Sequence, residues 1–138
     1  MDPEESLRRA EVLRGARVLV VEDDMLLLME LESVLLDAGA EIAGLCRTVD
    51  DALTITDESR VSAAILDVRV GQQTIAPVAR RLASRGTPFV FYTGQIESDP
   101  ELKEWKGHKV LSKPARRSAI VAAVADLLNG CSQLDRAP

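Results

Sequence analysis

Five short apolar runs along the chain have the length and composition of buried β-strands. They are rich in β-branched, leucine, alanine or aromatic residues, and each is followed by a polar or charged residue. Because a buried parallel strand does not carry charges through its middle, these polar residues must lie at the strand ends. The runs cover residues 17–21, 41–46, 61–66, 88–92 and 109–112.

Segments with helical spacing separate these runs. The first has an apolar face that should pack on a sheet, and Gly39 supplies its C-terminal stop. Further helices are predicted over about 48–57, opened by Thr48 as N-cap, over 74–85, and over 115–128, ended by Asn129-Gly130. The predicted face of the first helix comprises Leu27, Leu31, Val34, Leu35 and Ala38.

This first helix is apolar over more of its circumference than an ordinary surface helix requires, because Leu26, Leu28, Met29 and Leu36 lie off the predicted face. Two explanations stay open. Flanking residues such as the segment 4–14 could cover the extra apolar side chains, or these side chains could form a protein–protein surface.

The segment from Gly94 to Gly107 has few core-facing residues and predicts a helix that is short or loosely held. Trp105, the single tryptophan, is interpreted as a packing residue that pins this segment to the body of the protein. His108 is interpreted as a residue at the start of a strand, because nothing near it resembles a partner that would orient a base.

Strands and helices alternate along the chain, which predicts an α/β fold with a parallel sheet covered by helices on both faces. Parallel strands deliver their C-terminal ends to one edge of the sheet, where ligands usually bind. The residues expected at that edge are Glu22, Asp23, Asp67, Thr93 and Lys113. Three carboxylates, a hydroxyl and an ammonium suit Mg²⁺-dependent phosphoryl transfer onto a carboxylate.

Length and composition fit one domain, because 138 residues with 46% hydrophobic content can fill a single core. We expect an N-terminal extension over 1–15 that can form a helix, the main domain over 16–129, and a flexible tail over 130–138.

The 17 basic and 22 acidic residues give a net charge of −5, which disfavours binding to nucleic acid or to an anionic membrane surface. Cys46 and Cys131 lack metal-ligand spacing and are interpreted as small thiols that are buried or semi-buried. With no signal peptide pattern and no apolar run of membrane-spanning length, a cytoplasmic location is expected.

Four motifs, in this order, carry a resemblance to a known family: Val20-Val21-Glu22-Asp23-Asp24, Asp67, Thr93 and Lys113-Pro114. Through them the chain resembles the receiver domain of bacterial two-component response regulators, from Arg17 to Leu128. The piece Pro88–Gly94 is similar to a subgroup of receivers whose fourth strand ends Phe-Ala-Thr-Gly, with Tyr92 here in place of the alanine. The resemblance implies a flavodoxin-like (βα)5 doubly wound fold whose five-stranded parallel sheet has the order 2-1-3-4-5.

The resemblance also implies a role for each residue. Asp67 would accept the phosphoryl group, and Mg²⁺ would be held by Glu22, Asp23, Asp67 and the main-chain carbonyl of Arg69. Lys113 would neutralise and anchor the transferred group, and the Thr93 hydroxyl would bond to it and draw in the end of its strand. Val110 stands where many receivers carry an aromatic switch residue, so Tyr92 is a hypothetical substitute as the moving ring.

The function this implies is that of a single-domain receiver, which is not an enzyme beyond its own phosphotransfer and dephosphorylation. Its partners would be a sensor histidine kinase or a histidine phosphotransfer protein, and a downstream protein whose binding is switched; phosphate relay, a phosphate sink and a homodimer also remain open. A phosphorylation-independent interaction module is the alternative. A Mg²⁺-dependent phosphatase is disfavoured, because Arg69 stands where its acid/base aspartate would be needed.

Overall fold

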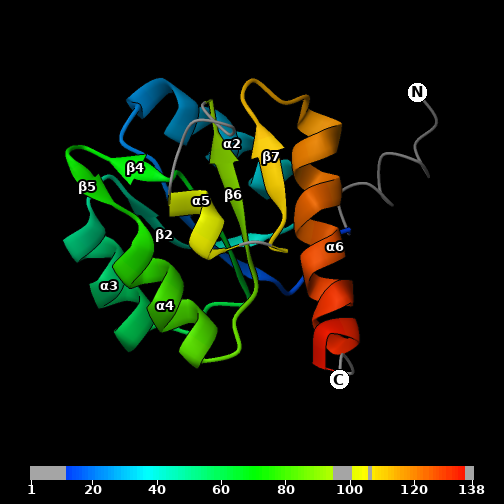
Figure 1. Cartoon of the computed structure of the whole chain (residues 1–138). Coiled ribbons are helices and arrows are strands. Elements are labelled where there is room, and N and C mark those ends of the chain that lie inside the picture. The colour runs from blue at the N-terminus through cyan, green and yellow to red at the C-terminus, as the bar shows by residue number, and fades with distance from the viewer. Residues whose placement is uncertain (1–11, 95–100, 106, 136–138) are drawn as a thin grey trace.

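A parallel sheet forms the centre of the protein, which is shown in Figure 1 as a computed structural model that describes residues 12–94, 101–105 and 107–135. Its five strands are β1 (Arg17–Val21), β2 (Glu41–Cys46), β3 (Ala63–Leu66), β6 (Phe89–Thr93) and β7 (Val110–Ser112). They stand in the order β2-β1-β3-β6-β7, and every neighbouring pair is parallel. Numbered along the chain, this is 2-1-3-4-5, so the predicted fold is confirmed.

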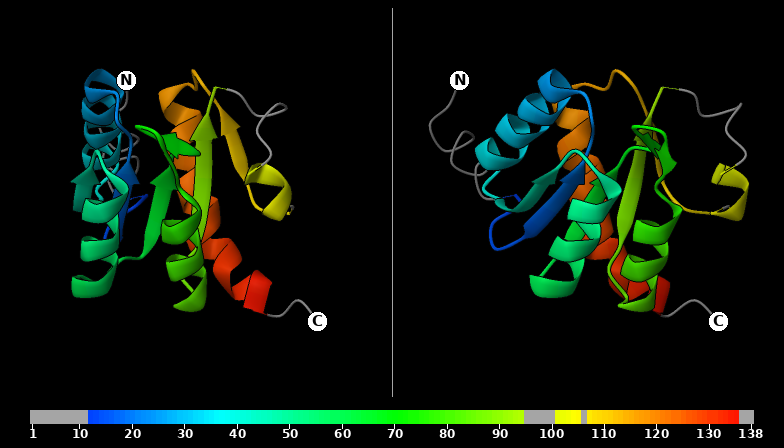
Figure 2. Two further views of the ribbon diagram at one scale, coloured as in Figure 1. Left: turned by 60° about the vertical axis from the view of Figure 1, so that its left-hand side comes forward. Right: turned by 90° about the vertical axis from the view of Figure 1, so that its left-hand side faces the viewer.

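Helices cover both faces of the sheet. One buried cluster joins the sheet to α2 (Met25–Asp37) and α6 (Arg117–Asp135), and a second joins it to α3 (Val49–Glu58) and α4 (Ala76–Ser84). Figure 2 shows α3 and α4 on one side of the strands and α6 on the other. Because side chains alternate along a strand, β1 sends Val18 and Val20 into the first cluster and Leu19 and Val21 into the second.

The predicted apolar face of α2 is correct except at one position. Leu28 is buried, whereas Leu27 is only partly buried. The two residues are consecutive in the helix and lie at the border of the apolar face, so the spacing of apolar residues alone did not show which of them is buried. Leu26, Met29 and Leu36 remain exposed, at 79%, 56% and 50%.

The N-terminal part of the chain enters the core at Leu13. This side chain is fully buried, and its N–H donates to the carbonyl oxygen of Ala38 at the end of α2. Residues 12–15 form a turn, and the rest of the predicted extension, residues 1–11, lies outside the described residues.

Two short strands interrupt the expected alternation of strands and helices. β4 (Arg69–Val70) and β5 (Gln73–Thr74) pair antiparallel in a small hairpin between β3 and α4. Gly71 turns the chain between them with φ of +63°, a conformation that glycine adopts without steric cost. The prediction of strict alternation was wrong here, because two-residue strands are too short to produce a period in the sequence.

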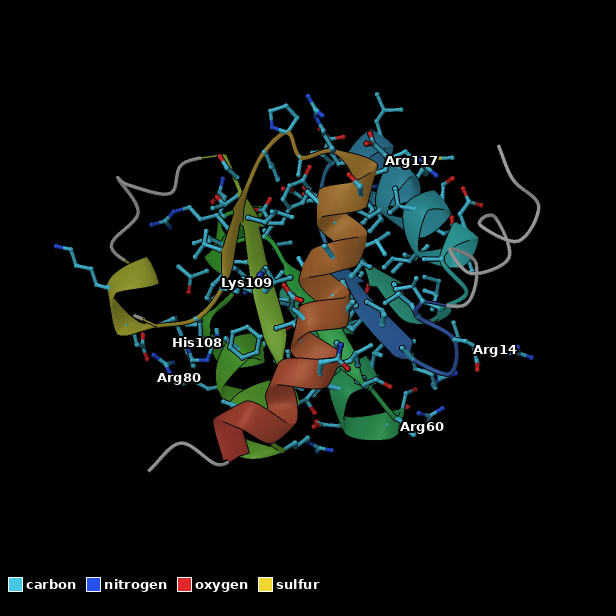
Figure 3. The ribbon with its side chains drawn as sticks, turned by 90° about the vertical axis from the view of Figure 1, so that its right-hand side faces the viewer. Arg14, Arg60, Arg80, His108, Lys109 and Arg117 are labelled. Carbon is cyan, nitrogen blue, oxygen red and sulfur yellow. The ribbon has the colours of Figure 1, made fainter. Side chains whose placement is uncertain are left out.

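The last helix also differs from its prediction. α6 continues through Asn129-Gly130 to Asp135. A glycine that ends a helix usually adopts a left-handed backbone with positive φ, and Gly130 does not have a positive φ. Glycine inside a helix costs only about 1 kcal/mol relative to alanine, so the helix passes through it. At the other end of α6, Arg117 lies beside α2 and contacts Asp37 at 2.7 Å (Figure 3).

Aromatic packing holds the segment that precedes β7. α5 (Glu101–Glu104) is a single turn, and the Trp105 ring that follows it packs edge-on against Phe89 at 5.5 Å between centroids. His108 stacks on the same Phe89 ring at 4.9 Å. The packing interpretation of Trp105 is therefore confirmed, and His108 lies just before β7, as predicted (Figure 3).

Cys46 is buried at the end of β2, as interpreted from the sequence, and burial together with the charge of Asp51 raises its pKa to about 11. Among the described residues, no helix is both long and apolar enough to cross a lipid bilayer.

Candidate functional site

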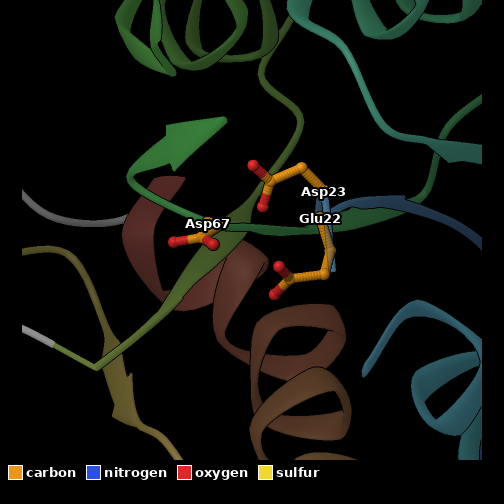
Figure 4. Close-up of side chains that lie close together, drawn as sticks. All are labelled: Glu22, Asp23 and Asp67. Carbon is orange, nitrogen blue, oxygen red and sulfur yellow. The ribbon is translucent and has the colours of Figure 1, made fainter. Parts of the chain in front are cut away.

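Three carboxylates converge where β1 and β3 end. Glu22 and Asp23 follow β1 directly, and Asp67 follows β3. β1 and β3 are neighbours in register, with Val21 opposite Leu66, so the residues that follow them come together. One carboxylate oxygen from each of the three residues lies within 4.8 Å of the others (Figure 4).

Lys113 joins two of these carboxylates from the end of β7. Its ammonium nitrogen lies 2.7 Å from Glu22 Oε1 and 2.9 Å from Asp67 Oδ2. The side chains of Glu22, Asp67 and Lys113 are 2%, 13% and 18% exposed, so both ion pairs are shielded from solvent. Shielded pairs of this kind feel more of each other's charge than surface pairs do.

Burial is the main reason why the pKa of Glu22 is raised above the usual glutamate value, and the charge of Asp67 adds to it. Lys113 and the N–H of Asp24, which donates to Glu22 Oε2 at 3.1 Å, oppose this rise without cancelling it. Burial also lowers the pKa of Lys113, but its contacts with Glu22 and Asp67 together outweigh burial, and the net pKa is raised. Lys113 is therefore fully charged at neutral pH.

A backbone N–H and an arginine side chain orient Asp23. The N–H of Gly71, in the β4–β5 turn, donates to Asp23 Oδ2 at 2.8 Å. The guanidinium of Arg47 donates to the carbonyl oxygen of Asp23 from two nitrogens, at 3.1 and 3.2 Å. The carboxylate and the main chain of this residue are thus fixed from two sides. Asp24 does not join the cluster, because its side chain caps the N-terminus of α2.

Thr93 ends β6 beside the cluster and is buried, with 5% exposed. Its carbonyl oxygen accepts a hydrogen bond from the N–H of Lys113 at 3.0 Å, which ties the ends of β6 and β7 together. Arg69 begins β4, two residues beyond Asp67, with an exposed side chain. The sheet therefore brings Glu22, Asp23, Asp67 and Lys113 together, with Thr93 on the adjoining strand.

The cluster has the donor set and the charge that suit a divalent cation. Three carboxylates and one ammonium leave two negative charges when all are ionised. Glu22 Oε1 is fully buried and, apart from its ion pair with Lys113, has no hydrogen-bond partner, so it retains lone pairs that water does not reach. Hard carboxylate oxygens are the ligands that Mg²⁺ prefers.

A family model for the response regulator receiver domain matches residues 18–125, which include the whole of this cluster. The chain belongs to that family.

Solved structures agree with this assignment. SdrG from Sphingomonas melonis Fr1 is 36% identical to the chain, with a TM-score of 0.72, over 86% of this chain and 98% of that one. A CheY-like receiver domain protein from Methanospirillum hungatei JF-1 is 18% identical, with a TM-score of 0.75, over 86% and 98%. The response regulator PhyR from Brucella abortus is 22% identical, with a TM-score of 0.72, over 90% of this receiver but only 53% of PhyR. The last two similarities show the fold alone, and no curated protein sequence matches significantly.

Three residues at this receiver's site were not predicted from the sequence: Arg47, Gly71 as a donor to Asp23, and Tyr92 as a contact of Lys113. The glycine in the loop after Asp67 could have indicated a turn. Its hydrogen bond to Asp23, which is far away in the chain, could not be predicted from the sequence. No local pattern marks Arg47, because its contact with Asp23 depends on β2, which Arg47 follows, lying beside β1, which Asp23 follows.

We expect that Gly71→Ala lowers the free energy of unfolding by about 1–2 kcal/mol, because an alanine at φ +63° meets the steric cost of the left-handed region. The turn would also shift its N–H away from Asp23. Thermal or urea unfolding measures the effect. Gly94→Ala is the matched control, since its added methyl also meets open space but Gly94 has no positive φ; equal losses in both variants would contradict the prediction.

Proposed function

We propose that this receiver accepts a phosphoryl group on Asp67 in a Mg²⁺-dependent reaction, with a sensor histidine kinase or a histidine phosphotransfer protein in the cytoplasm as the donor. Phosphorylation would then switch the binding of a downstream protein, or the phosphoryl group would be passed on. The observation that carries the proposal is the placement of the Lys113 ammonium between Asp67 and Glu22, beside the carboxylate of Asp23.

Glu22, Asp23 and Asp67 supply the oxygens that would hold Mg²⁺, and the main-chain carbonyl of Arg69 remains a predicted further ligand. Bound Mg²⁺ supplies positive charge that offsets the repulsion between a carboxylate and an incoming phosphoryl group. The fixed orientation of Asp23 by Gly71 means that part of this site is formed before the metal binds.

The other residues act on the oxygens of the transferred group. Asp67 presents its carboxylate oxygen as the nucleophile, and the ammonium of Lys113 is already within hydrogen-bond distance of that carboxylate. A preorganised cation at this place stabilises negative charge as it develops on the phosphoryl oxygens. The Thr93 hydroxyl is the proposed donor to a phosphoryl oxygen after transfer, which would pull on the end of β6.

A direct test is to incubate the protein with acetyl phosphate and Mg²⁺ and to measure its intact mass. The proposal expects a gain of one phosphoryl group, and no gain when a chelator removes Mg²⁺. Absence of any gain would favour an interaction module that works without phosphate. Release of free phosphate over many turnovers would favour an enzyme of the phosphatase type.

The raised pKa of Glu22 predicts how Mg²⁺ binding depends on pH. A proton and Mg²⁺ compete for the ionised carboxylate, so the affinity for Mg²⁺ should fall as the pH drops through this raised pKa. We expect a limiting slope of about tenfold per pH unit, one proton being displaced per metal ion. Calorimetric titration at several pH values measures it.

The metal-free stability should change in the opposite sense. A carboxyl group whose pKa is raised by folding contributes stability below its unfolded pKa, near 4.3, and loses that contribution as the pH rises through the folded value.

Glu22→Gln is the control for both pH dependences, since it removes the titrating carboxyl group and keeps the shape of the side chain. A pH slope of Mg²⁺ affinity that is the same in Glu22→Gln and the wild type would exclude Glu22 as its source.

A further inference from the structure

Tyr92 lies beside the site but on the opposite face of β6 from Thr93. Its side chain is 2% exposed and belongs to the cluster that packs against α2 and α6. Successive residues of a strand point to opposite faces, so Tyr92 and Thr93 lie on the two sides of the same strand end. The ring is therefore buried within the core in this structure, and the moving ring considered from the sequence stays a prediction.

Two contacts connect this ring to the residues around Lys113. The ammonium nitrogen of Lys113 lies 5.6 Å from the centroid of the Tyr92 ring, within the range of a cation–π interaction. The Tyr92 hydroxyl oxygen accepts a hydrogen bond from the N–H of Ala115 at 3.1 Å. One side chain thus contacts the ammonium group and also the backbone just after Lys113-Pro114.

Lys113 needs such support because a lysine side chain is flexible and its charged end can rotate among several positions. Glu22 and Asp67 attract the ammonium, but both are also the residues proposed to bind Mg²⁺, and Asp67 is the residue proposed to be modified. The Tyr92 ring is a third contact that does not change charge when the metal binds or when Asp67 is modified. The attraction of the ring for the ammonium is therefore independent of metal binding and of the modification of Asp67.

We propose that Tyr92 is a positioning residue for Lys113. Its aromatic face holds the ammonium beside Asp67, and its hydroxyl fixes the turn that carries the lysine. This role rests on the proposed function only for its effect on phosphorylation, because the placement of the ammonium can be measured without any phosphoryl transfer.

The first experiment measures the exposure of Lys113 directly. Brief acylation of the metal-free protein, followed by peptide mass mapping, gives the reactivity of Lys113 relative to the exposed Lys109. We expect Tyr92→Leu and Tyr92→Met, which lack an aromatic face, to raise this ratio several-fold. Tyr92→Phe keeps the face and loses only the hydrogen bond from Ala115, so its ratio should rise much less than in the Leu and Met variants.

Val90→Ala is the control for a loss of core packing. Val90 lies two residues earlier on the same strand and in the same buried cluster. This variant should lose stability without raising the reactivity of Lys113. A cooperative thermal transition shows whether the Leu and Met variants are folded. One folded variant is enough for the acylation measurement.

The second experiment measures phosphoryl uptake from acetyl phosphate in a double-mutant cycle. We expect Tyr92→Leu to slow uptake about tenfold in the wild-type background, within the range that a desolvated cation–π contact supports. In the Lys113→Met background the same substitution should have no further effect, because residues that act through one another are not additive.

The outcomes separate the two proposals. Unchanged Lys113 reactivity in the Leu and Met variants, or an undiminished effect of Tyr92→Leu in the Lys113→Met background, overturns the role of Tyr92. A wild-type protein that takes up no phosphoryl group overturns the proposed function instead, and the acylation ratio still decides whether Tyr92 holds the lysine.

Discussion

Asp67→Asn is expected to gain no phosphoryl group from acetyl phosphate under conditions in which the wild type gains one. An amide oxygen carries no negative charge and is a poor nucleophile, so the reaction loses its acceptor. The fold should survive, because Glu22 keeps its own ion pair with Lys113 and the new side chain still offers a carbonyl oxygen. We expect a stability change of only about 1 kcal/mol. Intact mass and thermal unfolding measure the two effects.

Asp126→Asn is the matched control for this prediction. Asp126 has a side chain that is 66% exposed and pairs with Lys109 on the surface, away from the cluster. The same chemical change there should leave phosphoryl uptake at the wild-type level. If Asp67→Asn were still modified once, and the group were mapped to another aspartate, Asp67 would not be the acceptor.

Lys113→Met is expected to slow phosphoryl uptake by at least about a hundredfold, the loss that follows removal of one preorganised electrostatic donor. Mg²⁺ affinity should rise rather than fall, because an ammonium within 2.9 Å of two proposed ligands competes with the metal. In the absence of metal, the free energy of unfolding should drop by about 3 kcal/mol, since a buried carboxylate loses its partner. Mg²⁺ should restore part of this loss.

The control for the lysine is Lys109→Met, which removes the same charge from just before β7, at the opposite end of the strand that Lys113 follows. Lys109 forms an exposed pair with Asp126 at 3.2 Å, and such pairs contribute at most about 1 kcal/mol. Equal effects of the two substitutions on uptake would show that net charge alone matters. A fall in Mg²⁺ affinity in Lys113→Met would contradict the charge argument.

Most of the fold could be predicted from the sequence because its elements are strongly patterned. The strands are continuous apolar runs, and α3, for example, begins after Thr48 as its spacing predicted, with the hydroxyl accepting the N–H of Asp51. The sheet order came from the resemblance alone, since no local pattern tells which strands are neighbours. The missed hairpin of β4 and β5 consists of strands of two residues, which are too short to show a period.

The candidate site was predictable in part for the same reason. Glu22, Asp23, Asp67 and Lys113 each follow a strand, and parallel topology carries such residues to one edge. The contacts that orient them were not predictable. Arg47 and Gly71 reach Asp23 from segments 24 and 48 residues away along the chain.

The sequence by itself determined the residue types at the strand ends and hence the chemistry of the site. The reason is that a buried strand consists of apolar residues, so the charged residues that follow it must lie at its end. Only the tertiary structure decided which groups touch: that Lys113 lies between Glu22 and Asp67, and that Tyr92 lies against the same ammonium from within the core. Contacts of this kind extend over only a few ångströms and depend on the register and spacing of neighbouring strands. They join residues that are far apart along the chain, so they leave no periodic pattern in the sequence.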